Sequence, residues 1–188
     1  MGAGVACLLA AGLPERVERL TLIDGLGAVT TDFPAAPRQL RKGLMARRRP
    51  GATAPRYADI ESAVTARVAG SATPIDSATA RPLVERNLEA WHGGVAAAQR
   101  SPLALASPVR LSSDQMLAML EAIRCDVLLV EGEDGILSER EGMAQRRAAV
   151  AELTRRVLAG GHHLHLEPGR VNAVAEVIAT HVHGIGRS

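Results

Sequence analysis

Aromatic residues and cysteines are both scarce in this sequence. Only 2% of its 188 residues are aromatic, namely Phe33, Tyr57 and Trp91, which argues against a single-stranded nucleic-acid site built on base stacking. The two cysteines, Cys7 and Cys125, lie far apart and lack the spacing of a metal site. We therefore expect a reducing, cytoplasmic environment and neither a bound metal nor a cofactor.

Long apolar runs and a strong excess of one charge are missing as well. No stretch reaches the roughly 18 to 20 apolar residues of a membrane span, and the apolar start lacks the basic leader of a secretory signal. The formal net charge of +2 is too small to imply an anionic partner. We expect neither a membrane nor a nucleic acid as a partner. The remaining balance, 47% hydrophobic and 22% charged, is that of a globular domain.

Helices and strands alternate at both ends of the sequence. Gly2–Ala11 predicts a buried helix that ends at Gly12-Leu13-Pro14, and Leu20–Ile23 predicts a strand after it. The apolar run Asp126–Glu131 predicts a buried parallel strand followed by a turn at Gly132–Gly135. Three further elements complete the pattern: a helix over 138–150, a strand over 155–159 and a helix over 168–182. This alternation predicts an α/β fold with a parallel sheet.

The middle of the sequence, residues 30–111, has a different pattern. It holds most of the prolines, lacks a clear strand, and shows helical periodicity near Ile60–Val68 and Ala78–Trp91. Its basic run RQLRKGLMARRR is typical of a solvated amphipathic helix rather than of a nucleic-acid site. The pattern predicts a helical insertion between two segments of one core, 1–29 and 112–188, with Ser112 or Ser113 capping the next helix.

Three histidines follow the last predicted strand, in the segment GGHHLH. Open α/β sheets bind their ligands beyond the carboxyl ends of the strands, so an imidazole here is placed for chemistry. Histidine changes protonation near neutral pH and can act as a general base. A structural cluster and a metal site formed by His162, His163 and His165 are the alternatives, although no carboxylate or cysteine partner for a metal is evident.

Two aspartates also end predicted strands. Asp24 follows the strand Leu20–Ile23, and Asp134 lies in the segment after Asp126–Glu131. Either carboxylate could orient an imidazole and stabilise its protonated form. The alternative for each is an ordinary turn aspartate next to a glycine.

Together these segments resemble the α/β-hydrolase fold family. MGAGVACLLAAGLPERVERLTLIDGLG resembles the segment directly after the family's nucleophile elbow, G-x-S-x-G, and Met1 and Gly2 match the last two positions of that elbow. IRCDVLLVEGEDGIL resembles the next strand and acid loop, and GGHHLHLEPGRVNAVAEVIATHV the histidine loop and final helix. The resemblance covers essentially the whole chain and is strongest to bacterial serine-hydrolase-like proteins. It implies a partial α/β-hydrolase fold: the three-strand, parallel, C-terminal half of the sheet with a helical cap inserted at 30–111.

The resemblance also implies roles for individual residues. His162 would be the general base, while His163 and His165 would pack or solvate the loop. The acid would be Asp24 or Asp134, with Asp24 slightly favoured, because the family's usual G-x-x-D spacing falls on Gly135 rather than on Asp134. The backbone N–H of Met1, the residue after the nucleophile, would contribute to the oxyanion hole.

The family's nucleophile is not found among these residues. None of Ser62, Ser71, Ser101 and Ser138 lies in G-x-S-x-G, so the resemblance places the nucleophilic serine ahead of Met1 in a longer parent protein. We expect that parent to hydrolyse an ester or similar bond of a small apolar substrate. We expect the 188 residues to be a truncated form, inactive by themselves, because losing the nucleophile of a catalytic triad costs on the order of 10⁶ in turnover. The alternative is a non-catalytic α/β domain that binds a partner.

Overall fold

The chain forms two units in a computed structural model that describes residues 1–48, 55–97, 105–137 and 140–184. The first unit combines Met1–Thr30 with Leu111–Ser188, and the second is Thr31–Arg110. Reading the second unit as a cap over the first stays a prediction. The first unit is the one that holds the candidate site.

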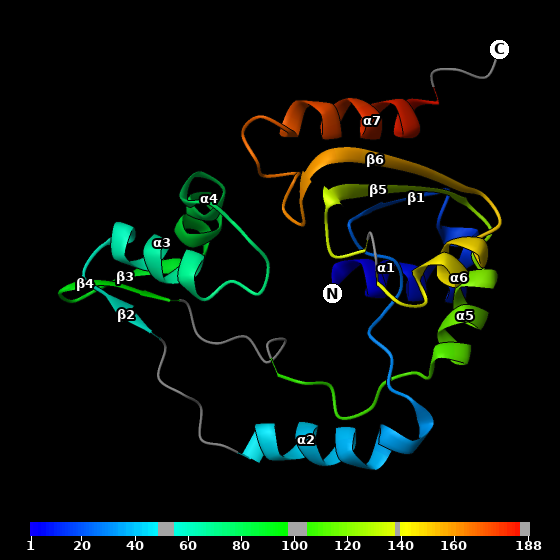
Figure 1. Cartoon of the computed structure of the whole chain (residues 1–188), viewed down its shortest axis with the longest axis horizontal. Helices are drawn as coiled ribbons and strands as arrows, with labels where there is room; N and C mark the ends of the chain where they lie inside the picture. Colours follow the sequence, from blue (N-terminus) through cyan, green and yellow to red (C-terminus); the bar gives the residue numbers. More distant parts are fainter. Residues whose placement is uncertain (49–54, 98–104, 138–139, 185–188) are drawn as a thin grey trace. The chain divides into compact units, whose positions relative to one another are not determined.

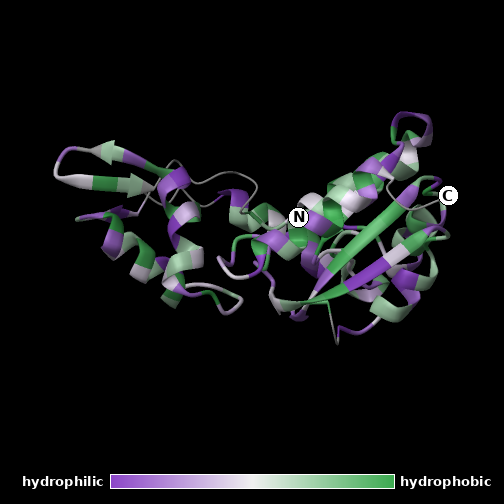
Figure 2. Ribbon diagram, turned by 90° about the horizontal axis from the view of Figure 1, so that it is seen from above, coloured by the Kyte–Doolittle hydropathy of each residue, from purple (hydrophilic) through white to green (hydrophobic). Residues whose placement is uncertain are grey.

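A three-stranded parallel sheet forms the centre of the first unit. Its strands are β1 (Arg19–Ile23), β5 (Asp126–Asp134) and β6 (Leu153–Gly161), in the order β1-β5-β6. The central strand β5 carries the apolar run, as expected for a strand covered on both faces. Figure 2 shows hydrophobic residues along much of this sheet, interrupted by hydrophilic stretches. The predicted α/β class with a three-strand parallel sheet is therefore confirmed.

Helices cover both faces of this sheet (Figure 1). On one face lie α1 (Gly2–Gly12), α5 (Ser113–Glu121) and α6 (Met143–Ala148); α7 (Val171–His183) lies on the other, and a 3-10 turn spans Pro14–Arg16. Side chains of β5 alternate between the two faces. Val127 and Leu129 join the cluster with α1 and α5, while Leu128 and Val130 join the cluster with α7.

Several elements of the first unit differ in length from the prediction. The segment Gly132–Gly135 is not a turn throughout, because β5 continues to Asp134. A Cβ at Gly132 would lie 2.5 Å from the carbonyl oxygen of Gly160, so this glycine permits a close approach of β5 and β6 rather than a chain reversal. Helix α6 is shorter than the predicted 138–150, while β6 extends beyond the predicted strand at both ends.

The second unit contains strands that the sequence pattern did not reveal. Its helices are α2 (Ala36–Arg48), α3 (Ile60–Ala69) and α4 (Ser77–Asn87), with a 3-10 turn at Phe33–Ala35. Strands β2 (Arg56–Tyr57), β3 (Leu88–Trp91) and β4 (Gly94–Ala97) form an antiparallel sheet in the order β2-β4-β3.

The sequence pattern predicted a mostly helical insertion without a clear strand, and the small sheet β2-β4-β3 is the feature that this prediction lacked. The helical pattern assigned to Ala78–Trp91 ends at Asn87, and residues 88–91 belong to β3. Gly93 in the turn between β3 and β4 (φ 96°) and Gly94 at the start of β4 (φ 152°) have positive φ values, which glycine adopts readily. This pair of glycines allows a tight hairpin where the sequence pattern indicated only the end of a helix.

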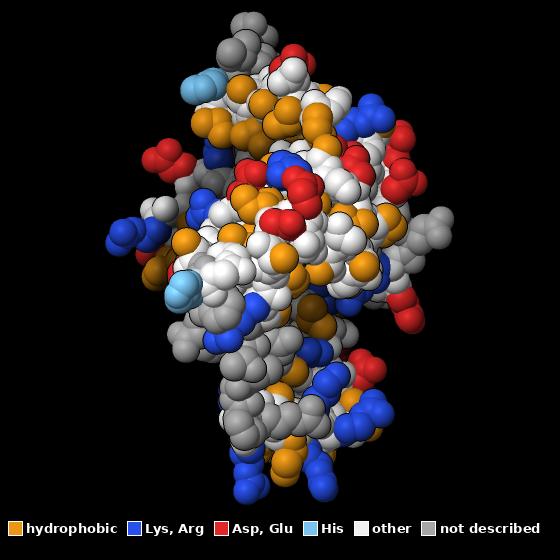
Figure 3. Space-filling model, turned by 90° about the vertical axis from the view of Figure 1, so that its left-hand side faces the viewer, with side chains coloured by type: hydrophobic (Ala, Val, Ile, Leu, Met, Phe, Trp, Pro, Cys, Tyr) orange, Lys and Arg blue, Asp and Glu red, His pale blue; other side chains and the backbone are white. Residues whose placement is uncertain are grey.

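The basic run forms helix α2 up to Arg48, and Arg49 lies outside the described residues. The small residue Gly43 faces the segment 105–110, since a Cβ there would overlap Pro108. Arginine and lysine side chains gather over the region of α2 in Figure 3, as predicted for a solvated helix face. Within the described ranges, no helix is both long enough and apolar enough to cross a membrane.

Candidate active site

An aspartate and a histidine from the two outer strands of the sheet meet at its carboxyl edge. Nδ1 of His162 lies 2.7 Å from Oδ2 of Asp24. Asp24 directly follows β1 and His162 directly follows β6, so the histidine loop crosses the end of β5 to reach it. Asp24 is only 1% exposed, whereas the side chain of His162 is 32% exposed.

The backbone at Asp24 is unusual and directs this contact. Its φ is 43°, the left-handed region that aspartate enters more readily than most side chains but still at some cost. The turn follows the last residue of β1 at once, and the N–H of Asp24 still donates to the carbonyl of Val130 on β5. Strained backbone of this kind is often found at functional sites.

Two donors converge on one oxygen of Asp24. The backbone N–H of Ile136 donates to Oδ2 at 2.9 Å, beside the His162 contact to the same atom. Burial by itself would raise the pKa of Asp24, but the hydrogen bonds from His162 and Ile136 outweigh it and lower the pKa below its ordinary value. The carboxylate is therefore ionised at neutral pH, and Nδ1 of His162 must be the donor.

This arrangement fixes which nitrogen of His162 can take part in chemistry. Because Nδ1 donates to Asp24, Nε2 is the ring nitrogen able to accept a proton. A buried carboxylate behind the ring also stabilises the imidazolium that forms when Nε2 is protonated. The pair can thus act as a general base with its orienting acid.

Asp134 is in a different environment. It ends β5 beside Gly161 of β6, and its side chain is exposed. The next residue explains how Asp24 reaches across β5, because a Cβ at Gly135 would overlap Oδ1 of Asp24. The carboxylate of Asp24 fills the space that a side chain at Gly135 would need, and Gly135 is the position on which the family's usual acid spacing falls.

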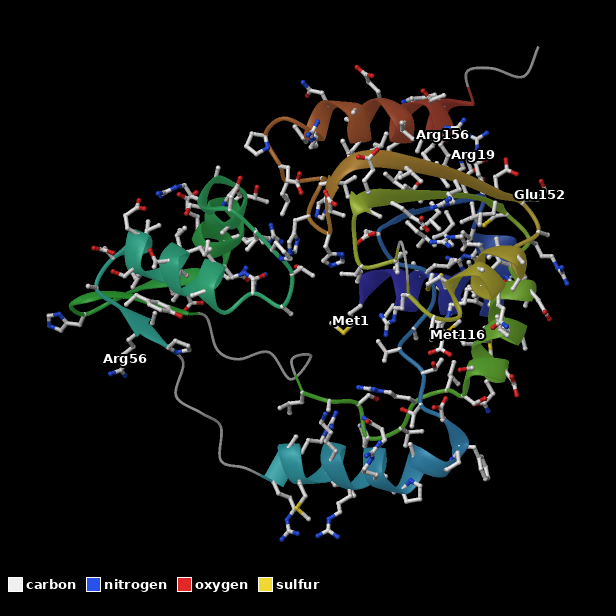
Figure 4. The ribbon with its side chains drawn as sticks, in the orientation of Figure 1. Met1, Arg19, Arg56, Met116, Glu152 and Arg156 are labelled. Carbon is white, nitrogen blue, oxygen red and sulfur yellow. The ribbon has the colours of Figure 1, made fainter. Side chains whose placement is uncertain are left out.

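The start of α1 lies next to this pair. A Cβ at Gly25, the residue after Asp24, would lie 2.7 Å from the Cβ of Ala3, and a Cβ at Gly4 would lie 3.0 Å from the Cα of Ala28. The first turn of α1 therefore packs on the loop that begins with Asp24. Met1 is the exposed residue before this helix (Figure 4).

Side chains of α5 and α6 contact the loop that follows β1. The guanidinium of Arg146 donates to the carbonyls of Leu26 and Ala28 at 3.0 and 2.9 Å. The N–H of Ala28 lies 3.1 Å from the sulfur of Met116, a fully buried side chain of α5 that is labelled in Figure 4. These contacts fix the segment that follows Asp24.

The other residues singled out from the sequence do not join the pair as ligands or nucleophiles. His163 packs its ring edge-on against His162, and burial is the main cause that lowers the pKa of His165. Among the described residues, no group of three or more His, Cys, Asp and Glu side chains could hold a metal ion.

The serines weighed as nucleophiles are also placed elsewhere or not described. Ser62 donates its hydroxyl to Asp59 at the start of α3, and Ser71 follows that helix in the second unit. Ser101 and Ser138 lie outside the described residues. Within the described ranges, no serine or cysteine hydrogen-bonds to His162.

A separate cavity of about 640 Å³ lies at the opposite edge of the sheet. It is bounded by the first residues of the three strands and by the end of α7, and its lining mixes the basic Arg19 and Arg156 with the acidic Glu152 and Glu176. Figure 4 labels Arg19, Glu152 and Arg156. The Asp24–His162 pair does not line it. The cavity and the Asp24–His162 pair therefore lie at opposite edges of the sheet.

Sequence reasoning missed two contacts that shape the site. The donor Ile136 is a backbone N–H, and side-chain patterns do not report where such groups point. Glu167, five residues after His162, accepts a hydrogen bond from the N–H of Gly161 at 2.9 Å. In the sequence, this contact is indicated only by a carboxylate, Glu167, that follows the glycine pair Gly160-Gly161 by a few residues.

Known proteins of similar structure share this arrangement of elements. A crystal structure of a hypothetical protein from Pseudomonas aeruginosa PAO1 superposes with a TM-score of 0.84 at 38% identity, over 95% of this chain and 63% of that one. The thioesterase domain from the curacin biosynthetic pathway superposes with a TM-score of 0.72 at 26% identity over the same shares. The chain therefore has the α/β-hydrolase fold.

A curated relative points the same way. The chain is 22% identical over 179 residues to a serine hydrolase-like protein of Dictyostelium discoideum, which corresponds to 89% of this chain and 50% of the relative. No family model matches the sequence. The chain thus spans about half of this relative and 63% of the two solved structures.

Proposed function

We propose that this chain supplies the general base and the acid of a Ser-His-Asp hydrolase. His162 is the base, Asp24 is the acid that orients it, and the nucleophilic serine lies ahead of Met1 in a longer protein. The 2.7 Å contact between Nδ1 of His162 and the buried carboxylate of Asp24 is the observation that carries this proposal.

The position of α1 supports the placement of the nucleophile. In the family the serine stands just before the helix that α1 resembles, and the first turn of α1 packs on the loop after Asp24. A serine there would attack an acyl carbonyl while Nε2 of His162 accepts its proton. Asp24 would stabilise the resulting imidazolium, and His162 would return the proton to the leaving group.

The backbone N–H of Met1 would then donate to the oxyanion. Met1 precedes an 11-residue helix, whose amino-terminal end favours negative charge. Preorganised backbone donors of this kind contribute a large part of the stabilisation of an acyl-transfer transition state. Water would release the acyl group in a second step, with His162 again acting as the base.

We propose a small apolar ester or thioester as the substrate. The thioesterase domain among the structural relatives supports an acyl substrate. Ile136, whose N–H holds Asp24, also leaves 39% of its surface exposed beside the pair, where an apolar group could bind. Cys7 and Cys125 are free thiols, which supports a cytoplasmic location, and the Pseudomonas relative supports a bacterial parent.

The test compares the 188 residues with a longer version that restores the in-frame codons upstream of Met1. We expect the longer protein to hydrolyse p-nitrophenyl esters or acyl thioesters, and we expect the 188 residues alone to show no turnover. Replacing the upstream serine with alanine, or making His162→Ala, should abolish the activity of the longer protein. A folded longer protein without turnover of any such substrate would refute the proposal. A stable dimer or complex without turnover would instead support the non-catalytic alternative.

A further inference from the structure

The carboxylate of Glu167 contacts the backbone of the two residues just before His162. Its Oε1 accepts the N–H of Gly161 at 2.9 Å. Its Oε2 lies against Gly160, since a Cβ at that position would be only 2.8 Å away. Both oxygens therefore lie against the two glycines that end β6.

These two glycines are the last residues of β6, and His162 is the first residue after the strand. Gly160 has a φ of 129°, and a Cβ there would also lie 2.9 Å from the Cβ of Leu164, so the position excludes larger residues. Two successive glycines leave the backbone its greatest freedom next to the residue that must be placed most accurately. A bond that restrains this pair restrains His162.

The rest of the loop ties Glu167 to rigid parts of the unit. Leu164 is fully buried in the cluster with Val174 of α7, and its N–H donates to the carbonyl of Gly161 at 3.1 Å. The carbonyl of Glu167 accepts the N–H groups of Arg170 and Val171, at 2.8 and 3.1 Å, where α7 begins. Glu167 thus joins the end of β6 to the start of α7.

We infer that Glu167 is a positioning residue whose carboxylate holds the Gly160-Gly161 backbone so that His162 stays aligned on Asp24. Its importance for turnover rests on the proposed function, but the alignment itself can be measured without turnover. Among the described residues, the charged or titratable groups that face His162 are Asp24 after β1 and His163 and His165 in its own loop.

Nuclear magnetic resonance of the 188-residue chain tests this directly. The Nδ1–H of His162 should give a low-field proton signal that disappears in Asp24→Asn. We expect Glu167→Ala to broaden or remove this signal and to speed exchange of the Gly161 amide about tenfold or more. Glu167→Gln keeps an acceptor oxygen and should retain both features. Glu176→Ala, an exposed glutamate of α7, is the matched control and should change neither.

Circular dichroism melts establish whether each variant is folded. A folded Glu167→Ala variant with an unchanged His162 signal and unchanged Gly161 exchange would overturn the inference. If that variant does not fold, hydrogen exchange of the Gly161 amide is measured in the unsubstituted chain. Slow exchange supports the hydrogen bond to Glu167, and exchange as fast as that of a free amide overturns the inference.

Kinetics in the longer protein separate this inference from the proposed function. Glu167→Ala should lower kcat about 10-fold to 100-fold with little change in KM, because a small misplacement of a base mainly affects the chemical step. Loss of kcat should be rescued by Glu167→Gln. If the longer protein has no turnover at all, the proposed function fails. The magnetic resonance measurements still test whether Glu167 aligns His162.

Discussion

The carboxyl ends of β1 and β5 each carry an aspartate, but the two aspartates have opposite surroundings. Asp24 is 1% exposed, adopts a left-handed backbone and accepts hydrogen bonds from His162 and from the N–H of Ile136. Asp134 ends the neighbouring strand with its side chain in solvent. The same residue type at the same sheet edge is thus a buried orienting group in one case and a solvated end in the other.

The difference shows that the enclosing groups, rather than the position along the sheet, set the environment of a carboxylate. The histidine loop crosses the end of β5, so a carboxylate on β5 would be the nearer one in strand order. Gly135 leaves the end of β5 without a side chain, and the carboxylate of Asp24 fills that space. An acid on the outer strand can therefore reach the histidine because its neighbour is a glycine.

Replacing each aspartate in turn should affect activity very differently. In the longer protein we predict that Asp24→Asn lowers kcat by about 10⁴, because the imidazole would lose both its orientation and the charge that stabilises its protonated form. Asp134→Asn should leave kcat close to that of the unsubstituted protein. Steady-state hydrolysis of a p-nitrophenyl ester measures both. Equal losses in the two variants, or the larger loss in Asp134→Asn, would reverse the assignment.

The order of elements in the first unit could be predicted from the sequence because its signals are local. The apolar run of β5 and the glycines at the ends of α1 and β6 indicate a strand, a helix end and a loop without any tertiary information. The capping box of Ser112 with Gln115 likewise marks the start of α5 within four residues. Local periodicity and capping therefore sufficed for the parallel sheet and its helices.

The remaining features depend on contacts between segments far apart in sequence. The choice between Asp24 and Asp134 needs the strand order and the space above Gly135, neither of which a single segment encodes. The small sheet of the second unit was missed because β2 has two residues and β3 directly follows a helix. Short strands beside helices give no period that distinguishes them.

The space that Asp24 occupies above Gly135 can be tested by filling it. Gly135→Ala should destabilise the fold by about 1 to 3 kcal/mol, because the added methyl group would overlap Oδ1 of Asp24 and force the loop to shift. It should also weaken the low-field signal of His162. Gly169→Ala is the matched control, since nothing lies within 4 Å of a Cβ there. Urea unfolding gives both free energies, and equal stability of the two variants would contradict the tight fit.

A smaller, graded effect should appear in the pH dependence of stability. The pKa of Asp24 is lowered in the folded chain, since the hydrogen bonds from His162 and Ile136 outweigh the opposing effect of burial. Its stabilisation is therefore present above the unfolded pKa of about 4 and is lost as pH falls through the lower folded value. Asp24→Asn should flatten the decline of unfolding free energy below about pH 4.

The control for that measurement is Asp134→Asn, which removes one negative charge from the exposed strand end. Urea unfolding at a series of pH values compares the three proteins. We expect the chain and Asp134→Asn to lose stability on acidification with the same slope. An Asp24→Asn variant with that slope as well would mean that the carboxylate is not held in its charged form by the fold.

The smallest expected effect is that of Asp134 on stability at neutral pH. Asp134→Ala should change the free energy of unfolding by less than about 0.5 kcal/mol, because an exposed side chain at a strand end gives up little when it is shortened. Thermal and urea unfolding of the 188-residue chain measure this without any need for turnover. A loss of several kcal/mol would show that Asp134 makes an enclosed contact. It would then compete with Asp24 for the role of the acid.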